Sequence, residues 1–410
     1  MPAEKLCNKN CNINLNFCIK ISRWVMKAIG VWPKPLEASI HQIFLRYLTH
    51  LICYGILVFL SVPSWLVLFL EVNNIYNRIR MTGPLLFSTM AILKYYNLIQ
   101  RENEIRSCIE EIEDDWKNMK FQEDLKLMIR SDKFGRKLTT ASACFTYGGA
   151  VFYCLLRPLV IGRIPSDDGN HTYLSLGYPV SSLIADTQQD PANTIMFIFQ
   201  FIAGLATHSI AVASSSLTVV LVMHISGRMD VVTSWLDRVV QNCDKVECID
   251  DIFSQIITHH ARTLRFIAQT EYILNHISFV EVIGCTLNMC LLSYYTLQEY
   301  TGRPDFTITT YLTVLTYMIA NIFVLCYIGE ILVGQVCFSI ILNVYNYVIV
   351  YVQLQCKKVG DMSYMIDWYR LPKKRALNII LLMTISSNSR KSKLTAGNIM
   401  DLSLSRFGDV

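Results

Sequence analysis

Charged residues are scarce in this chain, and their scarcity argues against a water-soluble protein. Only 17% of the 410 residues are charged, whereas 52% are hydrophobic. Soluble domains usually contain about 25% charged residues. Too few charges are present to coat a body of this size, so the composition predicts a protein embedded in a membrane.

Signatures of catalysis are also missing. The sequence contains no G-x-x-x-x-G-K-S/T, G-x-G-x-x-G, H-E-x-x-H or G-x-S-x-G motif. Its 14 cysteines are scattered without a C-x-x-C pair, so neither a zinc site nor a disulfide framework is predicted. Adjacent His259 and His260 would point about 100° apart on a helix, and we interpret them as a solvated loop pair. We therefore expect no enzyme activity, metal, cofactor or nucleic-acid partner.

Long apolar runs are what the chain has instead. A helix needs about 20 apolar residues to cross ~30 Å of hydrocarbon. Six runs in the sequence fit this requirement approximately, at 43–70, 82–99, 138–162, 194–224, 273–297 and 306–334. The sequence therefore predicts an all-α fold, a polytopic bundle of membrane helices.

The distribution of basic residues predicts how these helices are oriented. The segments 1–42, 100–137 and 225–272 carry 20 Lys and Arg residues, whereas the segments on the other side carry 4. Basic residues favour the cytoplasmic side, so we expect a cytoplasmic N-terminus. The sequon at Asn170 falls in a loop on the opposite side, which agrees with glycosylation there.

Parity of the spans sets the expected domain organisation. A further apolar run, 336–354, follows the sixth span, but if it crossed the membrane, nine Lys and Arg residues in 355–393 would lie outside. We therefore interpret it as an atypical insertion. The expected regions are a cytoplasmic N-terminus at 1–42, a six-helix transmembrane region at 43–334, an apolar insertion with a polar connector at 335–362, and a cytoplasmic helix with a truncated seventh transmembrane helix at 363–410.

Several short patterns occur in an order typical of one family. They are Leu176-Gly177-Tyr178-Pro179-Val180, Val222-Met223-His224-Ile225-Ser226-Gly227-Arg228, Ile257-Thr258-His259-His260, Cys326-Tyr327-Ile328-Gly329-Glu330, Trp368-Tyr369-Arg370-Leu371-Pro372 and Leu394-Thr395-Ala396-Gly397. In their order and spacing over nearly the whole chain they resemble the insect odorant receptors, which have seven transmembrane helices and an inverted topology.

The resemblance implies a function. It implies an odorant receptor subunit that binds small volatile molecules and gates a non-selective cation channel in a heterotetramer with the shared co-receptor. The segment 225–272 is short, so the chain resembles a tuning subunit rather than the co-receptor. The implied location is the plasma membrane of olfactory sensory neurons, with membrane lipid around the helices.

The resemblance also implies site residues. The ligand pocket would lie in the outer halves of the second, third, fourth and sixth spans, and its expected residues are Phe87, Met90, Tyr147, Val151, Phe152, Phe197, Gln200, Phe201 and Tyr311. Subunits would meet through Trp368, Tyr369 and Leu371.

Ionisable residues inside predicted spans are functional candidates, because burying a charge in hydrocarbon is costly. His208 lies in the middle of the fourth run. Glu281, in the fifth, would pair with a neighbouring helix, and Glu330, near the inner end of the sixth, would have a structural or gating role. Lys94 is expected to extend to the nearby inner surface.

Four alternatives stay open at this point. A gustatory receptor of the same superfamily has the same architecture. A non-functional, truncated or wrongly predicted odorant receptor would explain the short final helix. A G-protein-coupled receptor would need the opposite charge bias, and a secondary transporter would show internal repeats, which the sequence lacks.

Overall fold

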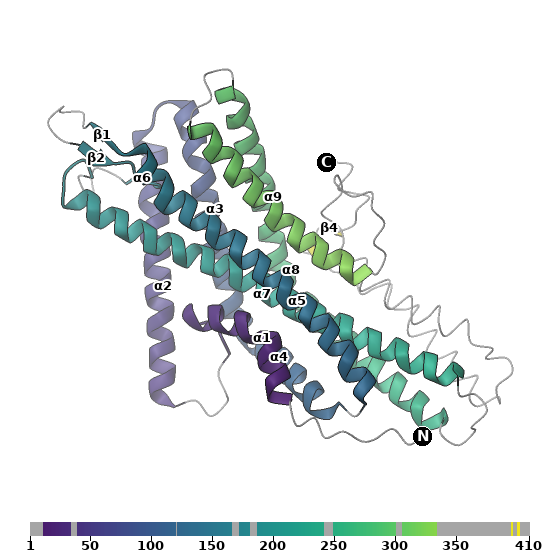
Figure 1. The fold of residues 1–410 in the computed structure, drawn as a ribbon. Coiled ribbons are helices and arrows are strands. Elements are labelled where there is room, and N and C mark those ends of the chain that lie inside the picture. The colour runs from purple at the N-terminus through teal and green to yellow at the C-terminus, as the bar shows by residue number, and fades with distance from the viewer. Residues whose placement is uncertain are drawn as a thin grey trace.

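Long helices make up most of the described structure (Figure 1). The computed structural model describes residues 11–33, 39–119, 121–165, 172–180, 187–241, 249–300, 306–333, 395–396 and 400–401. The main helices are α1 (Cys11–Ala28), α2 (Ile40–Leu66), α3 (Ile75–Gln100), α4 (Glu102–Asn118), α5 (Gln122–Val151), α7 (Ala192–Gln241), α8 (Ile249–Tyr300) and α9 (Phe306–Val333).

Short elements complete the described chain. Two π-helical turns follow α2 and α5, and a one-turn helix precedes a small hairpin. They are η1 (Val67–Glu71), η2 (Phe152–Leu156), α6 (Arg157–Ile161), β1 (Arg163–Pro165) and β2 (Thr172–Leu174), with a second ladder of β3 (Thr395–Ala396) and β4 (Met400–Asp401). Gly162 adopts φ +74° between α6 and β1, a conformation that glycine tolerates best.

Two helices are much longer than a membrane is thick. α7 has 50 residues and α8 has 52, so each extends for about 75 Å. That length is more than twice the ~30 Å of a hydrocarbon core. Figure 1 shows the two helices continuing together well past α3 and α9. The segments 100–137 and 225–272, expected as loops, are therefore largely helical, because apolar runs mark only the part of a helix that lies in hydrocarbon.

Four helical segments among the described residues are long and apolar enough to span a membrane. They are Ile40–Glu71, Gln122–Ile161, Ala192–Trp235 and Ser254–Gln298. These segments contain the first, fourth and fifth predicted runs, and the third except for its last residue, Gly162. The second run falls on α3 and the sixth on α9, whose described part includes a shorter apolar helix, Ile308–Phe323.

The outward face of α2 is apolar. Four apolar side chains along this helix and η1 are each more than 60% exposed: Phe44, Leu51, Phe69 and Leu70. Water would disfavour so large an apolar surface, whereas lipid tails would cover it. The surface agrees with the predicted membrane class.

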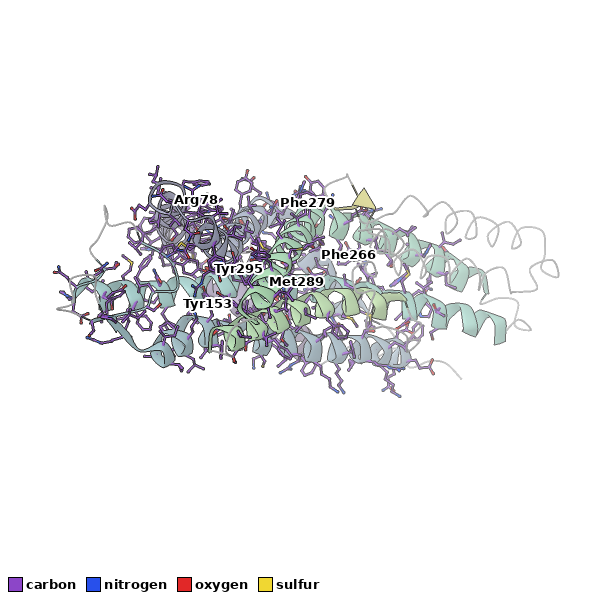
Figure 2. All side chains as sticks on the ribbon, turned by 90° about the horizontal axis from the view of Figure 1, so that it is seen from above. Arg78, Tyr153, Phe266, Phe279, Met289 and Tyr295 are labelled. Atoms are coloured by element: carbon purple, nitrogen blue, oxygen red, sulfur yellow. The ribbon has the colours of Figure 1, made fainter. Side chains whose placement is uncertain are left out.

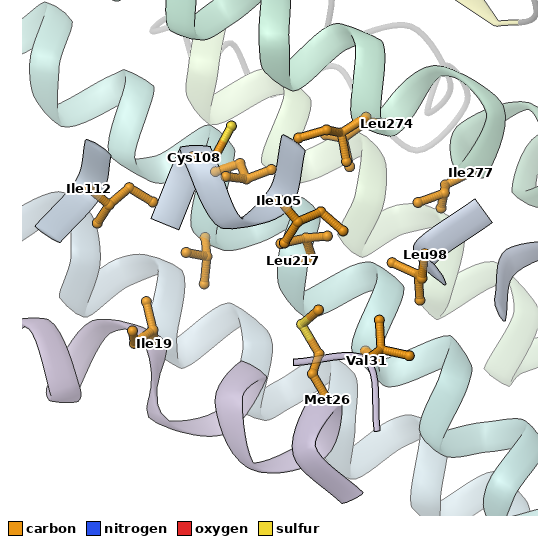
Figure 3. Packing of buried hydrophobic residues seen from close by; sticks show 14 of the residues in the cluster. Ile19, Met26, Val31, Leu98, Ile105, Cys108, Ile112, Leu217, Leu274 and Ile277 are labelled. Atoms are coloured by element: carbon orange, nitrogen blue, oxygen red, sulfur yellow. The ribbon is translucent and has the colours of Figure 1, made fainter. Parts of the chain in front are cut away.

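A large apolar core lies where α1, α3, α4, α7 and α8 meet, with further residues from α2 and α5 (Figure 3). Met26 of α1, Ile105 and Ile112 of α4, Leu217 of α7 and Leu274 of α8 are each at most 2% exposed. α1 and α4, which lie outside the predicted spans, therefore attach to the long helices through a packed interior.

Candidate functional site: a cavity lined by tyrosines

A cavity of about 110 Å³ lies between the helices, at the end of the bundle that carries the β1–β2 hairpin. This is roughly ten times the space that one water molecule needs. Its wall comes from α3, α5, η2, α6, the 172–180 segment, α7, α8 and α9. The lining residues are Arg80, Gly83, Pro84, Phe87, Gly149, Phe152, Tyr153, Arg157, Tyr178, His208, Asn288, Leu291, Leu292, Tyr295, Thr310, Tyr311, Thr313, Val314, Tyr317 and Met318. We call it the tyrosine cavity.

Aromatic side chains supply much of this wall. Tyr295 of α8 and Tyr311 of α9 lie with their ring centroids 5.7 Å apart, and Phe87 of α3 lies 4.9 Å from the ring of His208. Figure 2 shows Tyr295 and Tyr153 in the same region, reached from different helices. An apolar wall with a few polar groups is the usual composition of a site for a small organic ligand.

The polar groups of the cavity differ in how they are paired. His208 Nδ1 lies 2.7 Å from the Gly204 carbonyl oxygen, and Asn288 donates to the Gly284 carbonyl at 3.1 Å. The buried hydroxyls of Tyr295 and Tyr311 have no hydrogen-bond partner among the described residues. The two tyrosine hydroxyls are therefore available to a ligand.

A loop closes one side of the cavity and is held by a glutamine. The Gln200 side chain accepts a hydrogen bond from Tyr178 N–H at 3.1 Å and donates one to the Tyr178 carbonyl at 2.8 Å. The Ser64 hydroxyl donates to the Pro179 carbonyl at 2.8 Å, and the Tyr153 hydroxyl donates to the Gly177 carbonyl at 3.3 Å. These contacts fix the Tyr178 side chain, which is 4% exposed, against the cavity.

Three of the nine expected ligand residues line this cavity: Phe87, Phe152 and Tyr311. Met90 packs instead in an adjoining apolar cluster with Cys285.

The other expected residues lie outside the lining. The Tyr147 hydroxyl is 3.0 Å from Ser209 Oγ, and Val151 is 39% exposed. Gln200 holds the loop, and the side chains of Phe197 and Phe201 on α7 are partly buried away from the cavity.

Sequence analysis missed several lining residues. Tyr153, Tyr178, Asn288, Tyr295 and Tyr317 were not expected there, and only the pattern around Tyr178 had drawn notice. Periodicity within one helix cannot show which of its aromatic residues meets a neighbouring helix.

A buried charged group lies beside the cavity. Lys94 of α3 forms an ion pair with Glu281 of α8, and Asn321 of α9 donates to the same carboxylate at 2.8 Å. The expected pairing of Glu281 with a neighbouring helix is confirmed. The expectation that Lys94 extends to the inner surface is wrong, because its side chain is 2% exposed and points to Glu281. Burial of the carboxylate favours a buried cation as its partner.

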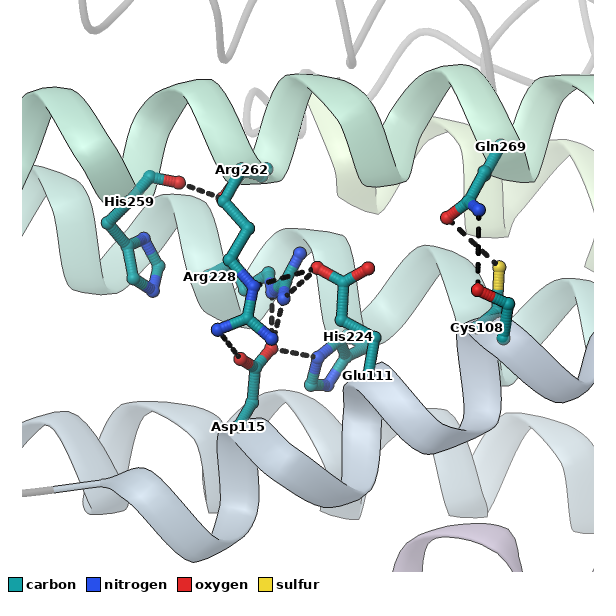
Figure 4. A network of polar contacts seen from close by, with 10 residues as sticks. Cys108, Glu111, Asp115, His224, Arg228, His259, Arg262 and Gln269 are labelled. Carbon is teal, nitrogen blue, oxygen red and sulfur yellow. Dashed lines mark hydrogen bonds and ion pairs between the residues drawn. The ribbon is translucent and has the colours of Figure 1, made fainter.

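A second polar group ties the extended parts of the long helices to α4 (Figure 4). Arg228 of α7 forms ion pairs with Glu111 at 2.7 Å and with Asp115 of α4, and it is only 1% exposed. His224 lies 2.9 Å from Asp115, and Arg262 of α8 reaches both carboxylates at 3.0 and 3.2 Å. We call Glu111, Asp115, His224, Arg228 and Arg262 the arginine cluster.

Electrostatics within the arginine cluster favour the ionised form of Asp115. Burial raises the pKa of this carboxyl, but the His224 hydrogen bond and the charges of Arg228 and Arg262 outweigh burial and lower the pKa to about 2. Asp115 therefore stays charged at neutral pH and neutralises the buried guanidinium.

The adjacent histidines belong to the same region. His260 is fully buried on α8, and the His259 ring lies 5.1 Å from the Trp235 ring. The interpretation of these residues as a solvated loop pair is wrong, because α8 begins at Ile249 and this face packs against α7. The sequence patterns at 222–228 and 257–260 thus meet in space.

Some expected sites lie outside the described residues. They are Asn170 and the expected subunit contacts Trp368, Tyr369 and Leu371. Glu330 lies on α9.

The long apolar helices define a multi-pass helical membrane protein. The chain belongs to the 7tm odorant receptor family, whose sequence profile matches residues 77–345. This is a receptor family rather than an enzyme family. Membership decides against the G-protein-coupled receptor and transporter alternatives. No curated protein matches the chain.

Solved structures of an insect olfactory receptor share the fold. The chain is similar to olfactory receptor OR5 from Machilis hrabei, with 14% identity, a TM-score of 0.73, and coverage of 98% of this chain and 96% of that chain. It is equally similar to the same receptor in complex with eugenol, with 13% identity, a TM-score of 0.74 and the same coverage. At such low identity the likeness shows the fold alone.

Proposed function

We propose that this chain is the odorant-binding subunit of a ligand-gated, non-selective cation channel, and that the tyrosine cavity is its odorant site. The observation that carries the proposal is the largely apolar cavity among the helices of a chain of this receptor family. The related receptor whose structure contains eugenol supports a small organic ligand. Burial of apolar surface would supply most of the affinity.

The family resemblance supports the proposed assembly, and the charge distribution supports the proposed orientation. The chain would pair with the family's shared co-receptor in a heterotetramer, with Trp368, Tyr369 and Leu371 at subunit contacts. The excess of basic residues in 1–42, 100–137 and 225–272 supports a cytoplasmic N-terminus. The proposed location, the plasma membrane of olfactory sensory neurons, rests on the family. The tyrosine cavity would then face the outer side, the side on which glycosylation of Asn170 is expected.

Three helices could transmit binding to the channel. α3, α8 and α9 each line the tyrosine cavity, and each also contributes one residue to the contact among Lys94, Glu281 and Asn321. A ligand that fits the cavity better in the open arrangement of these helices would shift the equilibrium toward it. The ion pair would keep the helices in register while they move.

Current recording from cells that express this chain with the co-receptor tests the proposal. A panel of odorants should evoke cation current only when both subunits are present. A matched pair of α9 variants tests the site. Val314→Trp fills the cavity and should abolish the response, whereas Leu312→Trp, at a side chain that is 46% exposed, should leave it. Both variants must reach the cell surface.

Loss of the response in both variants, or in neither, would contradict the placement of the odorant site. Current from this chain without the co-receptor would contradict the proposed partner. An antibody tag at the N-terminus that is reached only after permeabilisation would agree with the proposed orientation, and labelling of intact cells would contradict it.

A further inference from the structure

Three tyrosines that line the cavity, Tyr295, Tyr311 and Tyr317, have hydroxyls without a hydrogen-bond partner among the described residues, and the rings of Tyr295 and Tyr311 lie side by side. The hydroxyls of Tyr295 and Tyr311 are buried, and Tyr295 as a whole is 2% exposed. Neither hydroxyl has a partner among the described residues, although both side chains line the cavity. A buried hydroxyl without a partner is unfavourable, and the penalty is relieved when a ligand supplies an acceptor.

No described polar group lies within hydrogen-bonding distance of either tyrosine hydroxyl to supply that acceptor. The Asn288 amide donates to the Gly284 carbonyl, and His208 Nδ1 faces the Gly204 carbonyl. A carbonyl oxygen only accepts, so Nδ1 of the neutral His208 ring carries the proton. Each donor is thus committed to the backbone of its own helix, and the remaining acceptors, Asn288 Oδ1 and His208 Nε2, do not bond to the two tyrosine hydroxyls.

The charge around the cavity also restricts the ligand. The lining contains Arg80 and Arg157 but no aspartate or glutamate. Arg157 lies 5.6 Å from the centre of the Tyr153 ring, and neither arginine forms an ion pair among the described residues. A protonated amine would meet positive charge without a carboxylate to balance it, so cations are disfavoured.

We propose that the ligand of the tyrosine cavity is a small, neutral, largely apolar molecule with a carbonyl oxygen that accepts hydrogen bonds from Tyr295 and Tyr311. This inference rests on the proposed odorant site. A carbonyl oxygen has two lone pairs and can serve two donors from neighbouring helices. A hydrocarbon of the same shape would fill the cavity but leave both hydroxyls without an acceptor, which lowers its affinity.

Three compounds of nearly one shape separate the possibilities. Acetophenone carries a carbonyl group, α-methylstyrene has a C=CH2 group in its place, and 1-phenylethylamine is cationic at neutral pH. Binding to the purified full-length chain in lipid nanodiscs is measured by ligand-induced thermal stabilisation, which does not depend on channel opening. Current is recorded in parallel from cells that also express the co-receptor.

Acetophenone should bind about tenfold more tightly than α-methylstyrene, and the amine should bind least. The double variant Tyr295→Phe/Tyr311→Phe removes only the two hydroxyls and should reduce the preference to within about twofold. Tyr147→Phe is the matched control, because the Tyr147 hydroxyl is bonded to Ser209 outside the cavity lining, so this variant should keep the tenfold preference.

Equal affinity for the ketone and the hydrocarbon, or a preference that survives in the double variant, would overturn the inferred ligand class. So would binding of the amine alone, or binding of none of the three while other odorants evoke current. These outcomes leave the proposed receptor function intact. Selective binding without current from any odorant would instead support the ligand class and contradict the channel function.

Discussion

Lys94 of α3 and Glu281 of α8 form an ion pair that is buried between two helices, with side chains that are 2% and 8% exposed. Asn321 of α9 donates to the same carboxylate at 2.8 Å. A buried pair is sensitive to the loss of one partner, because the other charge then has no counter-ion. This contact therefore holds three helices that also line the tyrosine cavity.

Removal of one charge from this pair should destabilise the receptor strongly. Lys94→Met leaves Glu281 buried without a cation, and we expect a loss of about 3–5 kcal/mol of stability. The double variant Lys94→Met/Glu281→Leu should recover much of it, because no isolated charge remains. Thermal unfolding in detergent measures both effects.

Lys117→Met is the control for this experiment. Lys117 pairs with Glu113 at 3.0 Å, but the side chains are 52% and 39% exposed. Exposed pairs contribute at most about 1 kcal/mol, so this variant should unfold close to the unaltered chain. A Lys94→Met variant as stable as the control would contradict the structural role of the buried pair.

Acid should weaken the arginine cluster through Asp115. Its folded-state pKa of about 2 lies below the ordinary value of 3.8. A lowered carboxyl pKa gives stability that is present above the ordinary pKa and is lost as the pH falls toward the folded one. The difference corresponds to about 2–3 kcal/mol between pH 5 and pH 2.

Asp115→Asn should flatten this part of the pH profile and lower stability at neutral pH, since Arg228 loses a counter-ion. Denaturation in detergent, followed from pH 5 to pH 2, compares the two chains. Identical slopes would show that Asp115 does not contribute the acid sensitivity.

The hydrogen bonds between Gln200 and the Tyr178 backbone should maintain the shape of the cavity. Gln200→Leu removes both hydrogen bonds and leaves the Tyr178 N–H and carbonyl unpaired. We therefore expect the free energy of unfolding to fall by about 1–3 kcal/mol and odorant binding to weaken. Gln269→Leu is the control, because its amide makes two long contacts, with Ser107 Oγ at 3.4 Å and with Cys108 Sγ at 4.0 Å. Equal binding by the two variants would show that the loop keeps its position without Gln200.

Close packing of α3 on α8 should make Gly284 intolerant of a larger side chain. A Cβ atom at Gly284 would lie 2.1 Å from Met90 Sδ, so the methionine must move within a packed cluster. Gly284→Ala should destabilise by about 1–3 kcal/mol, and Met90→Ala should relieve the clash in the double variant.

Gly55→Ala gives the opposite expectation. No atom lies within 4 Å of a Cβ at Gly55 on α2. Alanine favours a helix by about 1 kcal/mol over glycine, so the variant should be neutral or more stable. Thermal unfolding compares the variants, and equal stability of Gly284→Ala and Gly55→Ala would contradict the close packing of Gly284.

The composition and apolar runs of the sequence determined the helical membrane class of this protein, because hydrocarbon requires long apolar helices whatever their neighbours. The ordered patterns along the chain also determined its family, which the family profile confirms. For Glu281, the cost of a buried charge was enough to predict an interhelical partner.

Only the tertiary structure decided which residues face one another. Lys94 was predicted to reach the inner surface because it lies near the end of a predicted span. The helix continues past that end, and the Lys94 ammonium group points toward Glu281. The arginine cluster joins Asp115, Arg228 and Arg262, and no local pattern relates their three helices. Side-chain partners between helices depend on rotation and register, which long-range packing sets and local sequence periodicity does not encode.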